Sequence, residues 1–331
     1  MKTTAIHMRR HGGPEVLEVV QVDVPPPGPG EVRIRQRAIG LNFADIYQRK
    51  GAAGPQAPAV FPVTPGANGA GVIESVGAGV SGLRVGQSVA YVQPGGYQVL
   101  RNVHAARVVV LDGAVPVEEA GANLLRGLTA EYLLRRLYAV KAGDFVLVHA
   151  AAGGMGVVLA QWARALGATV IGTVGSPQKM AVAEAHGCHH VIDYRQEDFS
   201  ARTLAITGGE GVAVVYDAVG RDVFLPSLRC LRPRGMAINY GTASGDVEAF
   251  DLQLLHARSL TVCRPTLRSF IAEPDELQQA AAALFAVVRA GQVRLDVGSR
   301  FGLLDVQRAH RELEGRMTTG APVLMVGDDL S

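Results

Sequence analysis

One stretch of the chain decides its fold: Phe145-Val146-Leu147-Val148-His149-Ala150-Ala151-Ala152-Gly153-Gly154-Met155-Gly156. Its first part is a continuous apolar run, which is typical of a strand buried on both faces of a parallel sheet. A glycine-rich turn follows. Apolar residues then recur at helical spacing, at Met155, Val158, Leu159, Trp162 and Leu166. The stretch therefore predicts a buried strand, a tight turn and an amphipathic helix that ends at Gly167.

The same alternation continues along the chain. Ser176 can cap a second helix that begins at Pro177 and ends at Gly187. Further apolar runs occupy Thr169–Val174, His190–Ile192, Val212–Tyr216, Met236–Gly241 and Leu260–Cys263. Six strands with intervening helices are typical of an α/β, doubly wound parallel sheet that binds a dinucleotide.

The residues on either side of this region follow a different pattern. From residue 1 to about 124, glycine and proline separate short β-like runs such as Glu31–Arg37 and Gly69–Gly77, which indicates a mostly β domain. After Arg264 a long alanine-rich helix is expected over about 275–290, followed by a helix from Asp305 and a strand at Val323–Val326. These last elements can rejoin the first domain. A chain of 331 residues exceeds what one core usually holds, so two domains are expected.

The glycine-rich turn matches the pattern G-x-G-x-x-G with Ala151, Gly153 and Gly156 at its three key positions. A side chain at 153 would keep the backbone from a diphosphate, and one at 156 would push the helix off the strand. The free N–H groups at the start of the helix can hold phosphate oxygens. An isolated glycine-rich turn is as often purely structural as it is a ligand site. Its position between a buried strand and an amphipathic helix favours a dinucleotide site.

The end of the second strand bears on the choice of nicotinamide cofactor. NAD-binding proteins carry an acidic residue about 20 positions beyond the glycines, where it holds the ribose 2′-hydroxyl. Gly175 lies there in this chain, and Ser176 and Lys179 offer a hydroxyl and an ammonium group instead. These two groups favour the 2′-phosphate of NADP(H). The alternative is that Ser176 only caps the helix and Lys179 is solvated.

Composition excludes several classes of protein. Lys+Arg 32 against Asp+Glu 30 leaves a net charge of +2, which does not suit a nucleic-acid binder. Three cysteines cannot form a disulfide framework, and neither a signal peptide nor a membrane-length apolar run is evident, so a cytoplasmic protein is expected. No phosphate-loop lysine, G-x-S-x-G, H-E-x-x-H or C-x-x-C motif occurs. Cys188-His189-His190 is expected to be structural, and no metal site is predicted.

The chain resembles the zeta-crystallin-like NADPH:quinone oxidoreductases, the zinc-independent branch of the medium-chain dehydrogenase/reductase superfamily. The resemblance runs nearly end to end, and its landmarks are Gly12–Leu17, Pro65–Val72, Gly127–Ala130, Val148–Gly156 and Val214–Gly220. It implies a GroES-like catalytic domain over 1–124, completed by 267–331, and a Rossmann domain over 125–266. It also implies NADP(H) in the cleft and a homodimer or homotetramer. Where zinc-dependent relatives carry metal ligands, this chain has Asn42 and Ala67-Asn68.

The resemblance also implies which residues bind the cofactor. Asn42, Thr129 and Tyr132 would line the nicotinamide, and the glycine turn would hold the diphosphate. Thr173, Ser176, Lys179 and Tyr194 would hold the 2′-phosphate end. The remaining contacts would come from Tyr240, Gly241, Thr242, Arg264, Thr266 and Arg316. The full implied set is Asn42, Thr129, Tyr132, Gly153, Gly154, Met155, Gly156, Thr173, Ser176, Lys179, Tyr194, Tyr240, Gly241, Thr242, Arg264, Thr266 and Arg316.

Asn42, Asp45 and Tyr47 are the candidate catalytic residues. Asn42 and Tyr47 can donate hydrogen bonds to a quinone or enone oxygen that gains charge as it is reduced. The alternative is that Asp45 caps a helix and Tyr47 packs at the edge of its domain. The resemblance implies NADPH-dependent reduction of quinones or related conjugated carbonyls without a metal. Two other activities stay open: reduction of enone or enoyl double bonds, and NADPH binding with little turnover.

Overall fold

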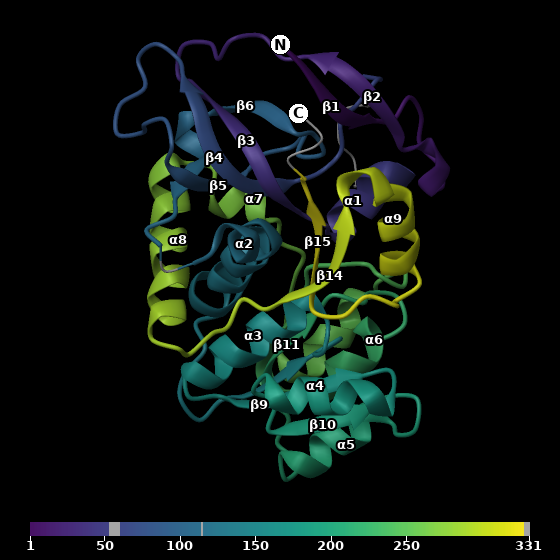
Figure 1. Ribbon diagram of the computed structural model, residues 1–331. Coiled ribbons are helices and arrows are strands. Elements are labelled where there is room, and N and C mark those ends of the chain that lie inside the picture. The colour runs from purple at the N-terminus through teal and green to yellow at the C-terminus, as the bar shows by residue number, and fades with distance from the viewer. Residues whose placement is uncertain (53–59, 114, 328–331) are drawn as a thin grey trace. The chain divides into compact units, whose positions relative to one another are not determined.

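The computed structural model describes residues 1–52, 60–113 and 115–327, and these form two compact units (Figure 1). Unit 1 comprises Met1–Arg126, Pro274–Val288 and Leu295–Ser331. Unit 2 comprises Gly127–Glu273 and Arg289–Arg294. The first division falls within two residues of the predicted one. The second falls later than predicted, after Glu273 rather than after residue 266, and a short segment past the long helix packs with unit 2.

Unit 2 contains a six-stranded sheet in which every pair of neighbours is parallel. The strand order is β10-β9-β8-β11-β12-β13, which is the doubly wound order with β8 as its first strand. Each predicted apolar run lies on one of these strands, although β12 begins before its run. The strands are β8 (Phe145–Val148), β9 (Thr169–Val174), β10 (His190–Asp193), β11 (Val212–Asp217), β12 (Leu231–Asn239) and β13 (Thr261–Cys263).

Helices follow the strands of unit 2 as the sequence predicts. The first, α3 (Gly154–Ala165), buries Val158, Leu159 and Trp162. The predicted second helix is divided into a 3-10 turn, η4 (Pro177–Lys179), and α4 (Met180–Ala185). The other helical elements of the unit are η3 (Tyr132–Leu137), α5 (Phe199–Ile206), α6 (Phe224–Ser227), η5 (Leu228–Cys230), η6 (Leu252–Arg258) and α7 (Leu267–Phe270).

Unit 1 is built on a seven-stranded sheet in the order β14-β15-β3-β4-β5-β7, with β6 also paired to β3. The C-terminal strand pairs with β3, so the end of the chain completes the N-terminal sheet as the sequence suggests. A separate pair, β1 and β2, is antiparallel. The strands are β1 (Lys2–His7), β2 (Glu18–Asp23), β3 (Glu31–Gly40), β4 (Asn68–Val76), β5 (Ser88–Val92), β6 (Leu100–His104), β7 (Val108–Val110), β14 (Val297–Gly302) and β15 (Ala321–Met325).

Helices α1 and α9 lie side by side in unit 1 (Figure 1). The buried face of α9 carries Val306, Ala309 and Leu313, which pack in one core with Ile46 of α1. The buried stripe of α9 also includes His310, a polar residue on an otherwise apolar face. The helical elements of the unit are η1 (Pro14–Val16), α1 (Phe43–Lys50), η2 (Ala105–Arg107), α2 (Val117–Glu131), α8 (Pro274–Arg289), η7 (Leu303–Asp305) and α9 (Val306–Glu314).

His149 is fully buried in unit 2, directly after β8. The Ser227 hydroxyl donates its proton to the Val223 carbonyl (2.6 Å). It can therefore only accept from His149 Nε2 (2.8 Å), which fixes the ring proton on that nitrogen. His149 Nδ1 then accepts from the Thr173 hydroxyl (2.9 Å). The ring is neutral, because burial lowers the pKa of His149 to about 3.

This buried histidine predicts that unit 2 loses stability in acid. Between a folded pKa of about 3 and the ordinary value of 6.5, the unfolded state binds more protons, so stability falls as the pH falls. We expect the free energy of unfolding to drop by about 2 kcal/mol from pH 7 to pH 5. Denaturant unfolding followed by the fluorescence of Trp162, the single tryptophan, measures this for unit 2. His149→Gln should remove the pH dependence and the exposed-site control His256→Gln should keep it, whereas a pH-independent wild type would contradict the assignment.

Candidate functional site

The turn between β8 and α3 places bare backbone at the carboxyl end of the sheet. Ala150 adopts a positive φ of 52°, and Gly153 N–H donates to the Ala150 carbonyl (2.9 Å). Gly156 lies so close to the strand that a Cβ would stand 2.4 Å from the Ala150 oxygen and 2.7 Å from Ala151 Cα. At Gly153 a Cβ would meet only the Ala150 oxygen, at 3.2 Å, and would otherwise point into open space. Gly156 is thus needed for packing, and Gly153 leaves an accessible cradle.

This cradle suits a diphosphate. Gly153 is the N-cap of α3, and the N–H groups of the first helical turn have no acceptor within the helix. Gly154 and Met155 supply two of them and are only partly buried. The turn follows β8, whose neighbour β11 lies on the other side of the point where the strand order reverses. In open α/β sheets ligands bind outside the carboxyl ends of the strands at this point.

Ser176, Lys179 and Tyr194 gather at the end of β9. Ser176 is the N-cap of η4, but its side chain makes no capping hydrogen bond, so the prediction that the hydroxyl caps this helix is wrong. The Tyr194 hydroxyl lies over Gly175, where a Cβ would stand 2.5 Å from that oxygen. Any larger residue at 175 would displace the tyrosine. No carboxylate follows β9 before Lys179 in the sequence.

Thr173 differs from the other residues predicted for this end of the cofactor. Its side chain is 1% exposed and its hydroxyl hydrogen-bonds His149 Nδ1. Thr173 therefore orients the buried histidine and does not present its hydroxyl at the surface, which corrects its predicted place among the phosphate-end ligands.

A second polar network fixes the loop after β12. Buried Asp217, at the end of β11, accepts from Val219 N–H (2.7 Å) and Gly220 N–H (3.0 Å). Asn239 Nδ2 donates to Asp217 Oδ2 (2.9 Å) and to the Gly241 carbonyl (2.8 Å). The structure thus ties Gly241 to the carboxyl ends of two strands, and burial raises the pKa of Asp217.

The remaining predicted cofactor residues of unit 2 extend from this network. Arg264 donates to Asn239 Oδ1, and Tyr240 and Thr242 flank Gly241 in the fixed loop. Thr266 is the N-cap of α7 and is exposed. Tyr132 begins η3 and stacks on Phe270, with ring centroids 4.2 Å apart. The remaining one, Thr129, is buried on the last turn of α2, whose residues from Gly127 onward belong to unit 2.

In unit 1 the side chain of Asn42 is locked in one orientation. The Gly121 carbonyl can only accept, so Asn68 turns Nδ2 toward it (2.7 Å). Asn68 Oδ1 then accepts from Asn42 Nδ2 (2.9 Å), which also donates to the Gly40 carbonyl (3.3 Å). Both N–H groups of the Asn42 amide are therefore used. The prediction that Asn42 donates to a quinone oxygen is corrected, because both amide protons are used within the protein and Oδ1 takes part in the capping box of α1.

Asp45 and Tyr47 lie on α1, three and five residues after Asn42. Asp45 is buried, and its Oδ2 accepts from Asn42 N–H (2.8 Å) at the start of the helix. The carboxylate therefore caps α1, as the alternative interpretation predicted. The Tyr47 ring is half-buried and its centroid lies 6.1 Å from that of Phe43. Arg316, also in unit 1, is exposed just after α9, with a φ of 58°.

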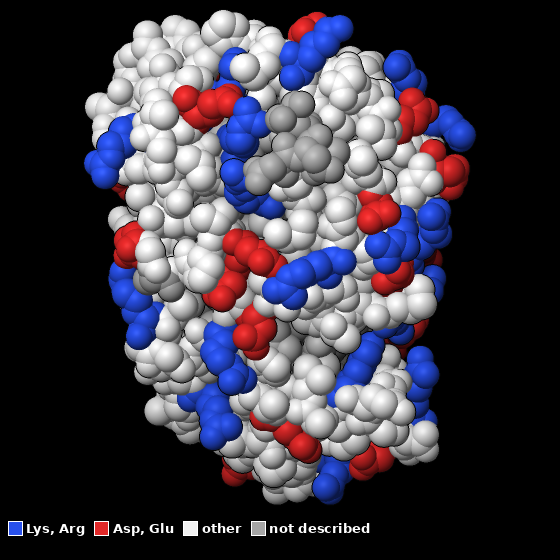
Figure 2. All heavy atoms as spheres, viewed as in Figure 1, with Lys and Arg blue, Asp and Glu red and all other residues white. Residues whose placement is uncertain are grey.

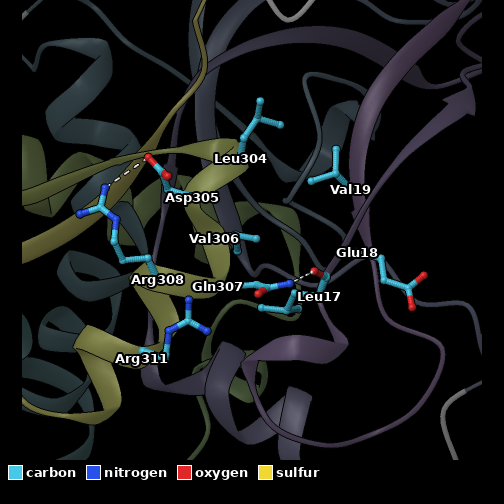
Figure 3. Close-up of a pocket in the computed structure, with 9 residues that line it drawn as sticks. All are labelled: Leu17, Glu18, Val19, Leu304, Asp305, Val306, Gln307, Arg308 and Arg311. Carbon is cyan, nitrogen blue, oxygen red and sulfur yellow. Dashed lines mark hydrogen bonds and ion pairs between the residues drawn. The ribbon is translucent and has the colours of Figure 1, made fainter.

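A cavity of about 520 Å³ lies between β2 and α9 of unit 1 (Figure 3). Arg308 and Asp305 form an ion pair on its wall, and Gln307 donates to the Leu17 carbonyl (3.0 Å). Figure 3 shows Arg311 near these residues. None of the predicted site residues lines this cavity, so we do not assign the cofactor to it.

Within residues 1–52, 60–113 and 115–327, no group of three or more His, Cys, Asp or Glu side chains could hold a metal ion. No helix in these ranges is both long and apolar enough to cross a bilayer. On the face drawn in Figure 2, cationic and anionic side chains are interspersed.

Comparison with known proteins identifies the family. Residues 28–136 match the model of the alcohol dehydrogenase GroES-like domain, and residues 154–286 match that of the zinc-binding dehydrogenases. The chain is 44% identical to a quinone oxidoreductase of Pseudomonas aeruginosa, over 97% of this chain and 98% of that protein. It is 41% identical to a 2-haloacrylate reductase of Burkholderia, over 96% and 97% of the two chains.

A solved structure supports the same assignment. The crystal structure of the Escherichia coli quinone oxidoreductase complexed with NADPH matches with a TM-score of 0.93 and 42% identity, over 97% of this chain and 99% of that one. At this coverage the match spans both units. The chain belongs to the quinone oxidoreductases, the zeta-crystallin-like family of the medium-chain dehydrogenase/reductase superfamily.

Proposed function

We propose that this protein reduces quinones with NADPH, without a metal ion. The observation that carries the proposal is the bare turn at Gly153, at the carboxyl edge of a doubly wound sheet, with Ser176 and Lys179 at the end of the next strand. It is supported by the 42% identity to the enzyme whose structure contains NADPH.

The chain's own residues would bind and orient the cofactor. The first-turn N–H groups of α3 hold the diphosphate, and the hydroxyl of Ser176 and the ammonium of Lys179 hold the 2′-phosphate. Bound NADPH supplies the hydride. Tyr47 donates a hydrogen bond to the acceptor oxygen, and Asn42 Oδ1 accepts one from a donor on the cofactor or on the reduced product. Solvent can provide the protons, so no obligate protein acid is needed.

A second candidate function is reduction of a conjugated carbon–carbon double bond. The 41% identity to a 2-haloacrylate reductase favours it, because that substrate is an α,β-unsaturated acid. Both activities use the same hydride donor and differ in the acceptor. A third possibility, NADPH binding with little turnover, is decided by the same assay.

An acceptor panel tests the function. We expect the rate of NADPH oxidation with 1,4-naphthoquinone to exceed the rate with 2-chloroacrylate or a linear enone. We also expect kcat/KM for NADPH to exceed that for NADH by at least about tenfold, a difference of about 1.4 kcal/mol. Faster turnover of the acrylate would replace the first function by the second. Tight NADPH binding without NADPH oxidation in the presence of any acceptor would mean that the protein only binds NADPH.

Replacement of Lys179 by alanine tests the 2′-phosphate site. Loss of the ammonium should raise KM for NADPH about tenfold or more and leave KM for NADH nearly unchanged, because only NADPH carries the 2′-phosphate. Lys141→Ala is the matched control. Lys141 is an exposed lysine of unit 2 that precedes β8, whereas the glycine turn follows β8. Equal effects of Lys179→Ala on both cofactors would remove Lys179 from the site.

The two glycines of the turn should respond differently to alanine. Gly156→Ala forces a Cβ against the Ala150 oxygen, so unit 2 should lose about 1–3 kcal/mol of stability, as followed by Trp162 fluorescence. Gly153→Ala should cost less than about 1 kcal/mol but weaken NADPH binding at least about tenfold, because the new methyl occupies the cradle. Unchanged NADPH affinity in Gly153→Ala would place the diphosphate elsewhere.

We also propose that the protein forms a homodimer, as the family resemblance implies. Leu252 and Leu254 of η6 are 68% and 49% exposed, and β13, the strand that follows, lies at the edge of the sheet of unit 2. Light scattering of the purified protein tests this against a monomer or a tetramer.

We also propose that the protein is cytoplasmic, because its free cysteines fit a reducing compartment. Cell fractionation tests this localisation.

A further inference from the structure

The peptide group that joins Leu41 to Asn42 is held at both ends by buried groups of opposite charge. Its carbonyl accepts a hydrogen bond from the guanidinium of Arg126 (2.7 Å). Its N–H donates to Asp45 Oδ2 (2.8 Å). Arg126 and Asp45 are 6% and 1% exposed. A single peptide unit, immediately before the Asn42 side chain, is thus clamped between a cation and a carboxylate.

Two further buried side chains support the carboxylate end of this clamp. The Tyr97 hydroxyl donates to the same Asp45 Oδ2 (3.1 Å) and contacts His310 Nε2 (3.0 Å). Since the single tyrosine proton is given to Asp45, His310 must carry its proton on Nε2 and donate to the tyrosine oxygen. His310 comes from the buried stripe of α9, and its Nδ1 has no hydrogen-bond partner among the described residues.

The charges around the clamp depend on one another. Burial raises the pKa of Asp45 to about 6, against the opposing effects of Asn42 N–H, Tyr97 O–H and the Arg126 cation. Burial also lowers the pKa of Arg126 to about 10, and Asp45 opposes that shift. Arg49 is the other cation near this group and acts on Tyr97 and His310. Once Asp45 is protonated, its hydrogen bonds are no longer made to a charged acceptor and Arg126 loses its counter-charge.

We propose that Arg126 and Asp45 clamp the Leu41–Asn42 peptide, with Tyr97 and His310 behind Asp45, and so position Asn42 for the reductase reaction. The inference rests on the proposed function, because Asn42 matters only if the chain turns over a cofactor and an acceptor. All four are positioning residues that act through the Asn42 backbone. The Asn68 contact fixes the orientation of the Asn42 amide, and the clamp fixes the backbone from which that side chain projects.

Tyr97→Phe tests the clamp, with Tyr91→Phe as the matched control. Both tyrosines are fully buried in unit 1, and the Tyr91 hydroxyl donates to Gln36 (2.5 Å) away from the clamp. We expect Tyr97→Phe to lower kcat/KM for the quinone about tenfold or more, because small misplacements at a reacting centre cost this much. The control should change it less than about threefold.

Hydrogen exchange of the Asn42 backbone N–H provides a readout that needs neither cofactor nor activity. Because Asp45 protects this N–H, its exchange in the cofactor-free protein should be about tenfold faster in Tyr97→Phe and unchanged in Tyr91→Phe. Should Tyr97→Phe not fold, Arg126→Met should show the same loss of kcat/KM and Arg126→Lys, which keeps the cation, should restore most of it.

The pH profile separates the clamp from a merely structural role. The ionised form of Asp45 is the stronger acceptor and the counter-charge of Arg126, so kcat of the wild type should fall as the pH falls through about 6. Asp45→Asn keeps the shape but not the charge. It should lower kcat at neutral pH and abolish this acidic limb.

The outcomes distinguish the clamp from the proposed function. An active wild type with equal kcat/KM in Tyr97→Phe and Tyr91→Phe would overturn the clamp and leave the reductase in place. An acidic limb of the kcat–pH profile that persists in Asp45→Asn would likewise overturn the clamp and leave the reductase in place. A wild type that reduces no acceptor would refute the proposed function, and with it the purpose of the clamp, even if the exchange of Asn42 N–H responds as expected.

Discussion

The close approach of α3 to the end of β8 is the constraint on which the rest of unit 2 depends. It is possible only because position 156 has no side chain, since a Cβ there would stand 2.4 Å from a backbone oxygen. With the helix seated this close, its N-terminal N–H groups face outward at the carboxyl edge of the sheet. The neighbouring strands then bring Ser176, Gly241 and Arg264 to the same edge. A backbone contact inside the fold thus decides where a diphosphate can bind.

Unit 1 depends on a different constraint, which is to hold one short segment in place. In this segment the chain has an amide pair, Asn42 and Asn68, whose orientation is dictated by the carbonyl of Gly121. The charges of this region act on the backbone instead. Arg126 and Asp45 hold the two ends of a single peptide group. Burying a charge costs free energy unless the charge is paired and hydrogen-bonded. Here each charged group hydrogen-bonds the backbone, and each lies in the electrostatic field of the other.

Much of the fold and part of the site could be predicted from the sequence. The six apolar runs of unit 2 and the turn at Gly153–Gly156 were predictable because burial on both faces and close backbone packing leave direct traces in residue type. The role of Asn42 could not be predicted from the sequence. A lone asparagine offers a donor and an acceptor, and only the Gly121 carbonyl, 53 residues from Asn68, decides which one remains. Thr173 was likewise assigned to the cofactor, because the sequence does not reveal that its hydroxyl meets His149.

By itself the sequence determined the doubly wound unit, the bare turn, the absence of an acid after the second strand and the family. Each of these depends on residues that are near neighbours along the chain. Tertiary structure alone decided which polar atoms stay available and which charges meet. Tyr97 and His310 are 213 residues apart and meet behind the Asp45 carboxylate only when α9 packs beside α1. A histidine on the apolar face of α9 hinted at a buried partner, but hydrogen bonds between distant segments leave no periodic pattern, so the partner could not be named in advance.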